Sequence, residues 1–375
     1  MQSTERVRIL VVDDSVLYRK VVRDVLKQHP QVEIIGVASD GKVALEKIEL
    51  LKPQLITLDI EMPGIDGLGV LRELKDRASD TKAIMLSSQS GHSAMSTMTA
   101  LQLGAFDFVL KPEEEDYQAS QTALAKKLLP CIDAYLSKHI IVPEHAETAN
   151  SFAAAAAFYS EPIVEDFDYV ESSQELEFRE PIRAVAIGIS TGGPAALTQE
   201  LPKILGDFPL PIFIVQHMPP VFTKSLAEDL NRLSQLEVVE GSDGAIVQPG
   251  TVYIAPGGLQ MAVIRNKDSF EIQINEDPPE RNCRPSVDYL FRSISDAYGN
   301  RCLAVIMTGM GDDGTAGVHL LSSTGVKVIA QDEPSSTVFG MPRSIIHHNL
   351  ADLVCPLNHI ASEITSCVNM SRRTG

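Results

Sequence analysis

The sequence predicts an α/β protein of two domains, each built on a parallel sheet, with an acidic connector between them. The 375 residues suffice for about two domains of ordinary size. Short β-branched runs alternate with helical patterns through the first 136 residues, and a strand-turn-helix pattern opens again at residue 182. We therefore place an N-terminal five-stranded domain at 1–139, a linker at 140–180 and a C-terminal α/β domain at 181–375.

Five apolar runs in the first domain predict strands, at 7–12, 32–37, 55–58, 83–86 and 106–110. A helical pattern follows each run, at 15–28, 41–51, 67–77, 93–103 and 118–136. Strands that alternate with helices in this way form a doubly wound parallel sheet, and ligands then bind at the carboxyl ends of its strands.

Polar side chains follow four of these strands. Asp13 and Asp14 come after the first, Asp59 after the third, Ser87 after the fourth and Lys111 after the fifth. Three carboxylates at one edge repel one another unless a hard cation such as Mg²⁺ lies between them. A nearby lysine suits a phosphoryl group. The sequence therefore predicts a site for Mg²⁺ and a phosphoryl group at this edge.

A plainer interpretation is that Asp13 and Asp14 only cap the helix that starts at Ser15. Because five polar positions converge on one edge, we favour the site for Mg²⁺ and a phosphoryl group over simple helix capping. The segments VVDDS (11–15), LDIEMPGIDG (58–67) and FVLKP (108–112) resemble the receiver domain of two-component response regulators. That resemblance implies Asp59 as phospho-acceptor, Mg²⁺ held by Asp13, Asp14 and Asp59, phosphoryl contacts from Ser87 and Lys111, and an aromatic switch at Phe108.

The linker carries much of the net charge. Residues 140–180 hold ten acidic residues and one basic residue, Arg179, while the whole chain carries −18. Such acidity favours a solvated segment, although its aromatic residues could dock transiently on a neighbour. No large segment is basic, so we expect no nucleic-acid binding, and a DNA-binding output domain is disfavoured.

The second domain opens with IRAVAIGISTGGPAAL (182–197), an apolar strand, a glycine-rich turn and a helix with Pro194 at its start. Gly188–Gly192 matches G-x-S-x-G, in which small neighbours expose a nucleophilic serine on a sharp turn. Backbone N–H groups at the helix start can stabilise an oxyanion. The same turn could instead bind a phosphate.

A nucleophilic serine needs a base and an acid that orients the base. PIFIVQHMPP (211–220) delivers His217 at the end of a strand, and CLAVIMTGMGDDG (302–314) delivers Asp312 and Asp313. All would meet Ser190 at one sheet edge. Their order, Ser, His, Asp, differs from that of α/β-hydrolases, so the motif does not assign that fold.

GMGDDG (309–314) also reads as G-x-G-x-x-G, with Asp332 at the spacing of a ribose-binding acid. Two aspartates beside the pyrophosphate position would repel it, which disfavours this nucleotide site. A further rival is a regulator whose second domain only binds a partner or a nucleotide, with Ser190 in a phosphate loop. Esterase turnover would separate the two classes.

Six segments of the second half are similar to the protein-glutamate methylesterase family of bacterial chemotaxis: IGISTGGP (187–194), QHMP (216–219), YIAPGG (253–258), RPSVD (284–288), MTGMGDDG (307–314) and FGMPR (339–343). The resemblance implies Ser190 as nucleophile, His217 as base and Asp313, rather than Asp312, as acid. Oxyanion donors would be the backbone N–H groups of Thr191, His217 and Met310.

The resemblance also implies the substrate and partners. The substrate would be glutamyl methyl esters on the cytoplasmic domains of methyl-accepting chemoreceptors, with certain receptor glutamines deamidated as well. A chemotaxis histidine kinase would be the phosphodonor, and ester hydrolysis would need no cofactor. The charged N-terminus and the lack of a stretch of about 18 apolar residues predict a cytoplasmic protein without direct membrane insertion.

Two residues depart from the family pattern. Ile189 stands where alanine is usual, and Cys283 stands where histidine is common, just before RPSVD. We expect neither to touch the triad. The five cysteines are far apart, without metal-ligand spacing, and we expect them to be small buried hydrophobes.

Overall fold

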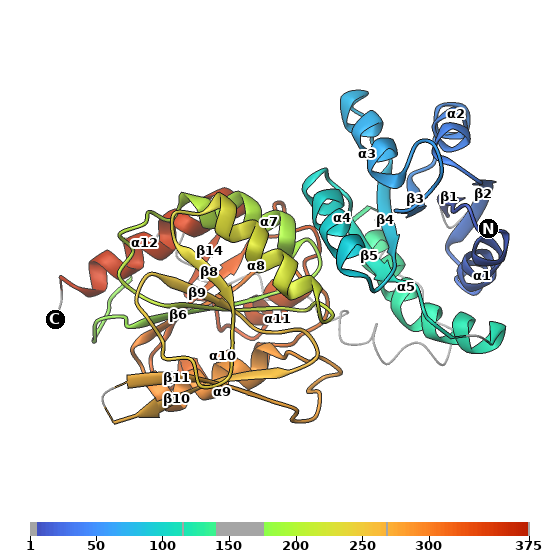
Figure 1. Cartoon of the computed structure of the whole chain (residues 1–375). Helices are drawn as coiled ribbons and strands as arrows, with labels where there is room; N and C mark the ends of the chain where they lie inside the picture. The colour runs from blue at the N-terminus through green and yellow to red at the C-terminus, as the bar shows by residue number, and fades with distance from the viewer. Residues whose placement is uncertain (1–5, 115, 140–175, 268, 374–375) are drawn as a thin grey trace.

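The computed structural model describes residues 6–114, 116–139, 176–267 and 269–373 (Figure 1). Two α/β units lie side by side, the N-terminal one blue to green and the C-terminal one green to red. Most of the predicted linker, residues 140–175, falls outside the described residues. The domain boundaries at 139/140 and 180/181 stay predictions.

The first unit is the predicted five-stranded parallel sheet, in the order β2-β1-β3-β4-β5. Its strands are β1 (Val7–Val12), β2 (Val32–Ala38), β3 (Leu55–Asp59), β4 (Lys82–Ser87) and β5 (Asp107–Leu110). Its helices are α1 (Val16–Leu26), α2 (Gly41–Leu51), α3 (Gly67–Asp76), α4 (Gly91–Gln102) and α5 (Tyr117–His139). The sequence therefore predicted every element, with end shifts of at most three residues.

Local chemistry explains where these helices begin. Ser15, Asp40, Asp66 and Ser90 each accept a backbone N–H of the following helix, as N-cap side chains do. Helices α2, α3 and α4 bury their apolar faces on one side of the sheet, and α1 and α5 cover the other. The carboxyl ends of the strands remain uncovered by these faces, which leaves the edge with Asp13 and Asp59 available for a ligand.

The second unit is a seven-stranded parallel sheet in the order β14-β13-β12-β6-β7-β9-β8. Its strands are β6 (Ala184–Ile189), β7 (Ile212–Gln216), β8 (Glu237–Glu240), β9 (Thr251–Ile254), β12 (Cys302–Ile306), β13 (Lys327–Gln331) and β14 (Leu353–Cys355). The strands that precede Ser190, His217 and the acidic pair are therefore neighbours, β12-β6-β7, at the centre of the sheet.

Helices cover both faces of this sheet. They are α7 (Gly193–Glu200), α8 (Phe222–Leu233), α9 (Val287–Tyr298), α10 (Thr315–Ser323), α11 (Met341–His347) and α12 (Ile360–Ser371), with short 3₁₀ turns η3 (Leu201–Lys203) and η4 (Leu357–His359). One apolar core includes α7, α8 and α12, and another includes α9, α10 and α11. The parallel sheet is thus buried on both faces, as its continuous apolar strands require.

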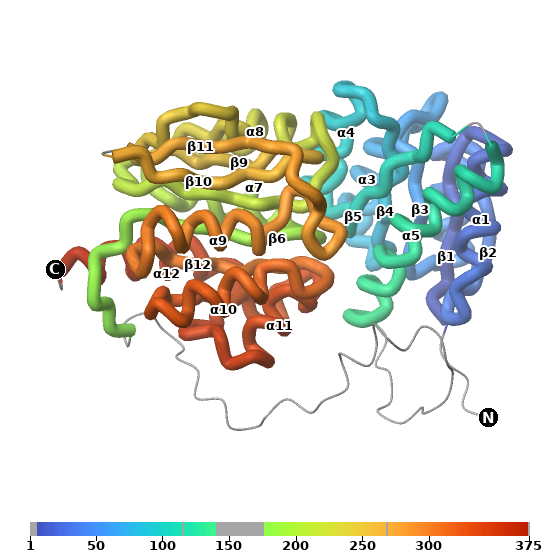
Figure 2. The backbone as a smooth tube through the Cα atoms, turned by 90° about the horizontal axis from the view of Figure 1, so that it is seen from below, coloured from blue at the N-terminus to red at the C-terminus, as the bar shows by residue number. Residues whose placement is uncertain are grey.

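A two-stranded antiparallel hairpin, β10 (Gln260–Asn266) and β11 (Ser269–Asn275), packs beside α9 and was not predicted. Its apolar residues Met261, Val263 and Ile272 are buried. Figure 2 shows the hairpin running along the C-terminal unit.

The two units contact each other through α4, which packs on α8 and α7 (Figures 1 and 2). Phe108 stacks on Phe222, with ring centroids 4.9 Å apart and an angle of 13° between the planes. Phe222 is fully buried and belongs to an apolar cluster with members in both units. The contact therefore includes a shared apolar core, and Phe108, which is partly buried, packs against it.

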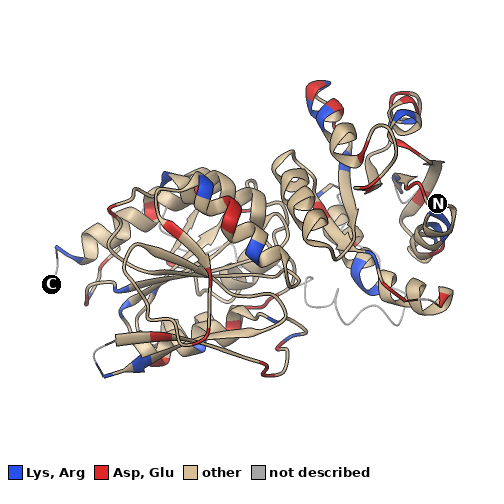
Figure 3. Cartoon of the chain, viewed as in Figure 1, with Lys and Arg blue, Asp and Glu red and all other residues tan. Residues whose placement is uncertain are grey.

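Acidic and basic residues are interspersed on the outer helices of the N-terminal unit (Figure 3). None of the helices in the described residues is both long and apolar enough to cross a membrane.

Candidate active site

The turn after β6 presents Ser190. Gly192 has φ +79°, a conformation that favours glycine, and the next residue begins α7. The Ser190 N–H donates to the Thr308 carbonyl at 3.0 Å, and Gln216 Nε2 donates to the Ser190 carbonyl at 2.9 Å. Neighbouring strands therefore fix the backbone of Ser190 while its side chain stays partly exposed.

His217 lies directly after β7, beside this turn. Its backbone N–H donates to the Ile189 carbonyl at 3.2 Å, which ties it to the residue before Ser190. Its ring Nε2 lies 2.8 Å from Asp313 Oδ2, and 15% of its side chain is exposed. The ring is thus held by a carboxylate and still reachable from outside.

Asp313 is held by the first turn of α9. Its carboxylate accepts from Ser286 Oγ at 2.9 Å, Val287 N at 2.7 Å and Asp288 N at 3.0 Å. Burial raises the pKa of Asp313, but the bond to His217 and these backbone donors lower it below its usual range. The carboxylate is therefore ionised and fixed in direction.

The neighbouring Asp312 has a different environment. It forms an ion pair with Arg281, and 48% of its side chain is exposed. Arg281 also donates to Asp288 Oδ2 at 3.0 Å. Of the two aspartates, only Asp313 lies within hydrogen-bond distance of His217.

The pKa of His217 lies well above its ordinary value. Burial of the ring lowers the pKa, but the hydrogen bond to Asp313 and the contact with Cys283 raise it more. Asp313 thus stabilises the imidazolium that forms when the ring takes a proton.

The ring nitrogen that Asp313 leaves free, Nδ1, faces a thiol. Cys283 Sγ lies 3.9 Å from Nδ1. Among the described residues, no hydrogen bond joins Ser190 Oγ to His217 in this arrangement. The prediction that Cys283 stays clear of the triad is wrong, because the segment before α9 brings its thiol to the Nδ1 atom of His217.

Cys131, Cys283, Cys302 and Cys355 are thiols outside any disulfide. Cys302, Cys355 and Cys367 are buried as expected, whereas Cys131 and Cys283 are partly exposed, which corrects the prediction for those two.

The three backbone N–H groups predicted as oxyanion donors differ in whether they already make a hydrogen bond. The N–H groups of Thr191 and Met310 have no hydrogen-bond partner among the described residues. A Cβ at Gly309, just before Met310, would lie 2.8 Å from Ser190 Cβ, so this backbone runs past the nucleophile. The His217 N–H is already bonded to Ile189, and this part of the prediction finds no support.

The second polar edge, in the N-terminal unit, gathers Asp13, Asp14 and Asp59. One oxygen from each lies within 4.8 Å of the others. Asp13 Oδ2 is buried without a hydrogen bond, although Lys111 Nζ is 2.8 Å away. Lys111 Nζ is also 2.8 Å from Asp59 Oδ2. Three clustered carboxylates, of which Asp13 and Asp59 are buried, supply the oxygen ligands that a hard divalent cation prefers.

The carboxylates and the lysine at this edge shift one another's pKa values. Burial raises the pKa of Asp59 to about 6, with Lys111 opposing the shift and Asp13 adding to it. Burial lowers the pKa of Lys111, but Asp13 and Asp59 outweigh it and raise the value. Ser87 Oγ bonds to Thr97 and to the Ser88 carbonyl and makes no hydrogen bond to Asp59.

A contact that sequence reasoning missed links the catalytic turn to the start of β5. Asp107, at the start of β5, accepts a hydrogen bond of 2.8 Å from Thr191 Oγ1, next to Ser190. Burial raises the pKa of Asp107 to about 6, and bonds from Phe108 N, Thr191 and Cys131 oppose the rise. Lys138 of α5 donates to the Ser336 carbonyl across the same interface. No local pattern marks such a contact, because it depends on docking.

The roles of Ser286 and Arg281 were also missed. The motif RPSVD contains Ser286 and was a usable signal, since its serine and aspartate begin the helix that braces Asp313.

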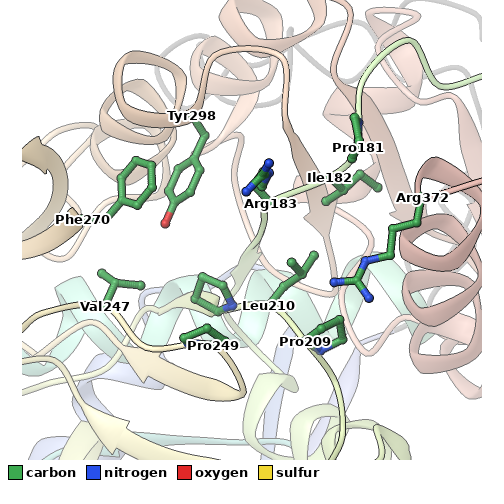
Figure 4. A pocket seen from close by; sticks show the side chains of 11 residues that line it. Pro181, Ile182, Arg183, Pro209, Leu210, Val247, Pro249, Phe270, Tyr298 and Arg372 are labelled. Carbon is green, nitrogen blue, oxygen red and sulfur yellow. The ribbon is translucent and has the colours of Figure 1, made fainter. Parts of the chain in front are cut away.

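A cavity of about 440 Å³ lies elsewhere (Figure 4). Its lining includes residues just before β6 and β7, such as Arg183 and Leu210, together with Tyr298. These strands carry Ser190 and His217 at their other ends, so the cavity is separate from the triad.

Comparison with known proteins agrees with this geometry. Residues 185–364 match the family described as CheB methylesterase, and residues 9–120 match the response regulator receiver domain. A protein-glutamate methylesterase/protein-glutamine glutaminase of Desulfotalea psychrophila is 48% identical over 98% of this chain and 100% of its own length. One of Bacillus subtilis is 40% identical, over 98% and 99%.

Among solved structures, the CheB methylesterase catalytic domain of Thermotoga maritima is 41% identical, with a TM-score of 0.49, covering 49% of this chain and 98% of that one. The full-length matches are decisive, since both domains align in the same order. The chain therefore belongs to the CheB methylesterase family, with a response regulator receiver domain ahead of the catalytic domain.

Proposed function

We propose that this chain hydrolyses γ-methyl esters of glutamyl side chains on chemoreceptors, and the side-chain amides of certain receptor glutamines, using Ser190, His217 and Asp313. The observation that carries the proposal is the braced His217–Asp313 pair on the strands next to Ser190. The names of the full-length relatives support the substrate class.

In the proposed reaction Ser190 Oγ attacks the ester carbonyl while His217 Nδ1 takes the hydroxyl proton. The N–H groups of Thr191 and Met310 stabilise the oxyanion, each contributing roughly 3 kcal/mol. The intermediate collapses as His217 returns the proton to the leaving methoxy group, and methanol departs. Water then attacks the acyl-enzyme through the same base, which frees Ser190 and the glutamate. For a glutamine, ammonia leaves instead.

The direct test is methanol release from methylated receptor cytoplasmic domains by the purified chain. Release of methanol together with new glutamates is expected. A chain that binds methylated receptor yet releases none would support the rival class, a partner-binding module.

In the receiver domain we propose Asp59 as the acceptor of a phosphoryl group from a chemotaxis histidine kinase. Asp13, Asp14 and Asp59 would hold Mg²⁺, which when bound screens the charge of the incoming phosphoryl group. Lys111, already 2.8 Å from Asp59, would pair with a phosphoryl oxygen. Ser87 would have to release its bond to Ser88 to contact that group.

Replacement of Asp59 by asparagine is expected to abolish phosphorylation, because an amide cannot attack the phosphodonor. Labelling with a small phosphodonor in Mg²⁺, followed by intact-mass measurement, checks this. Asp14→Ala should keep the acceptor but require more Mg²⁺, since one carboxylate ligand is lost. Undiminished labelling of the Asp59→Asn protein would place the acceptor elsewhere.

We propose that docking of the receiver restrains the catalytic turn through Asp107 and Phe108. Contacts of this kind typically couple by about 1 to 3 kcal/mol, which changes the population of the open form by roughly 5- to 150-fold. A fragment of residues 181–375 is therefore expected to hydrolyse receptor esters faster than the unphosphorylated full chain. A folded fragment that is no faster would contradict inhibition by the receiver.

A single substitution should reproduce part of this gain in the full chain. Asp107→Ala removes the bond to Thr191 and is expected to raise unphosphorylated activity by up to about tenfold, since a hydrogen bond to a charged group contributes roughly 1.5 kcal/mol. Asp133→Ala is the matched control, because Asp133 lies on α5 and pairs with His29. Equal rates for the two variants would exclude a role for Asp107.

A further inference from the structure

We infer that His217 and Cys283 form a binding site for a soft divalent metal such as Zn²⁺, and that the metal switches off the catalytic base. The site goes beyond the proposed hydrolysis, which uses no metal. It arises from Cys283, whose thiol lies beside the free ring nitrogen of His217.

The two ligand atoms have the required spacing. Zinc–nitrogen bonds of about 2.0 to 2.1 Å and a zinc–sulfur bond of about 2.3 Å at a tetrahedral angle put the two atoms about 3.6 Å apart. Cys283 Sγ and His217 Nδ1 are 3.9 Å apart. A shift of a few tenths of an ångström in the thiol therefore suffices to bind one ion between them.

The other side of the ring is arranged as in zinc proteins. A ligating imidazole usually gives its second nitrogen to a carboxylate, which fixes the ring and raises its basicity. His217 Nε2 makes that bond to Asp313 Oδ2, at 2.8 Å. Asp313 therefore orients the ring toward the metal without binding it.

Charge and access also favour a cation. Asp313 contacts the imidazole, and Asp288 and Asp312 share the single guanidinium of Arg281, so these three carboxylates outnumber the one cation paired with them. Both the imidazole and the thiol are partly exposed, so water can complete the coordination. When the metal binds, the Cys283 thiol and the protonated His217 ring at Nδ1 each release a proton to solvent, so binding should strengthen as pH rises.

Metal binding and catalysis exclude each other at this point. Nδ1 is the nitrogen that takes the proton of Ser190 in the proposed reaction, and a metal would occupy its lone pair. Zn²⁺ should therefore inhibit hydrolysis, and a chelator should restore it.

The first test measures binding without activity. Co²⁺ is titrated into the full chain with excess Mg²⁺ present, which occupies the carboxylate edge of the receiver. A thiolate-to-cobalt charge-transfer band is expected in the unaltered chain and in Cys355→Ala, a control that removes a buried thiol on the edge strand β14. Cys283→Ser should lose the band. A band that persists in Cys283→Ser, or never appears, overturns the site.

The second test measures affinity and inhibition. Asp313→Asn should bind Co²⁺ about 10- to 100-fold more weakly, the usual cost of losing such a carboxylate. Zn²⁺ should inhibit ester hydrolysis by the unaltered chain. At the same Zn²⁺ concentrations, Cys283→Ser should hydrolyse the ester as fast as it does without metal. The inhibition measurement rests on the proposed hydrolysis, whereas the cobalt absorption band does not. A failure of the metal site can therefore be distinguished from a failure of the proposed hydrolysis. Equal inhibition of both proteins by Zn²⁺ would contradict the proposal.

Discussion

Ser190→Ala is expected to lower ester hydrolysis by about 10⁴- to 10⁶-fold, because the nucleophile of a triad acts with its base as one unit. The folded structure should survive, since the Ser190 backbone bonds to Thr308 and Gln216 do not use the hydroxyl. Methanol release from methylated receptor gives the rate, and thermal unfolding gives the stability.

A matched control is Ser323→Ala, which removes an exposed hydroxyl bonded only to a carbonyl of its own helix. It should leave both rate and stability unchanged. Should Ser190→Ala keep more than about a tenth of the rate, the nucleophile would have to be another group, since oxyanion stabilisation alone leaves far less.

Asp313→Asn is expected to reduce the maximum rate by about 10⁴-fold, the loss known for the equivalent change in Ser-His-Asp enzymes. The amide cannot stabilise the imidazolium and favours the wrong tautomer. Asp312→Asn is the internal control, because its side chain pairs with Arg281 instead of His217. Its effect should be at least a hundredfold smaller by the same assay. Equal losses at the two positions would refute the assignment of the acid.

The pH profile adds a second signature. The base works when neutral, so activity rises as pH passes upward through the pKa of His217. Asp313 raises that pKa. Removing its charge lowers the pKa, and the acidic limb of kcat should move to lower pH even as the maximum falls. A limb that stays in place would mean that Asp313 does not set the protonation of the base.

The fold was accessible from sequence because local patterns and tertiary structure agree. Strands β1, β3 and β4 are nearly continuous apolar runs that end in polar residues, and parallel sheets buried on both faces require that pattern. The hairpin of β10 and β11 escaped prediction. Its strands alternate buried and exposed residues only weakly, and no tight-turn dipeptide joins them.

The candidate site was accessible for a different reason. Ser190, His217 and Asp313 each follow an apolar strand, and parallel strands bring their carboxyl ends to one edge. The sequence could not show which way the side chains and N–H groups of the site point. The choice of ring nitrogen for Asp313, the use of the His217 N–H by Ile189 and the position of Cys283 depend on loop paths set by packing far along the chain.

Contacts between the domains were the least predictable. Asp107 and Phe108 are ordinary residues within a strand until α4 docks on α7 and α8. Their partners, Thr191 and Phe222, lie more than eighty positions away in the sequence. The two surfaces fit each other only in the docked protein, so neither segment carries a hydrophobic periodicity that would predict the contact.

Among the described residues, strand β5 pairs only with β4 and is therefore one of the two edge strands of the receiver sheet, β2 being the other. Its Asp107 and Phe108 are covered by the catalytic domain. If phosphorylation separates the domains, the activated molecule exposes an aromatic ring beside an unpaired strand, a surface prone to self-association. The active form would then resist aggregation less well than the inactive form. Because β5 has four residues, little backbone is offered to another chain, and the active form should associate only at high concentration, as sedimentation of the phosphorylated chain would reveal.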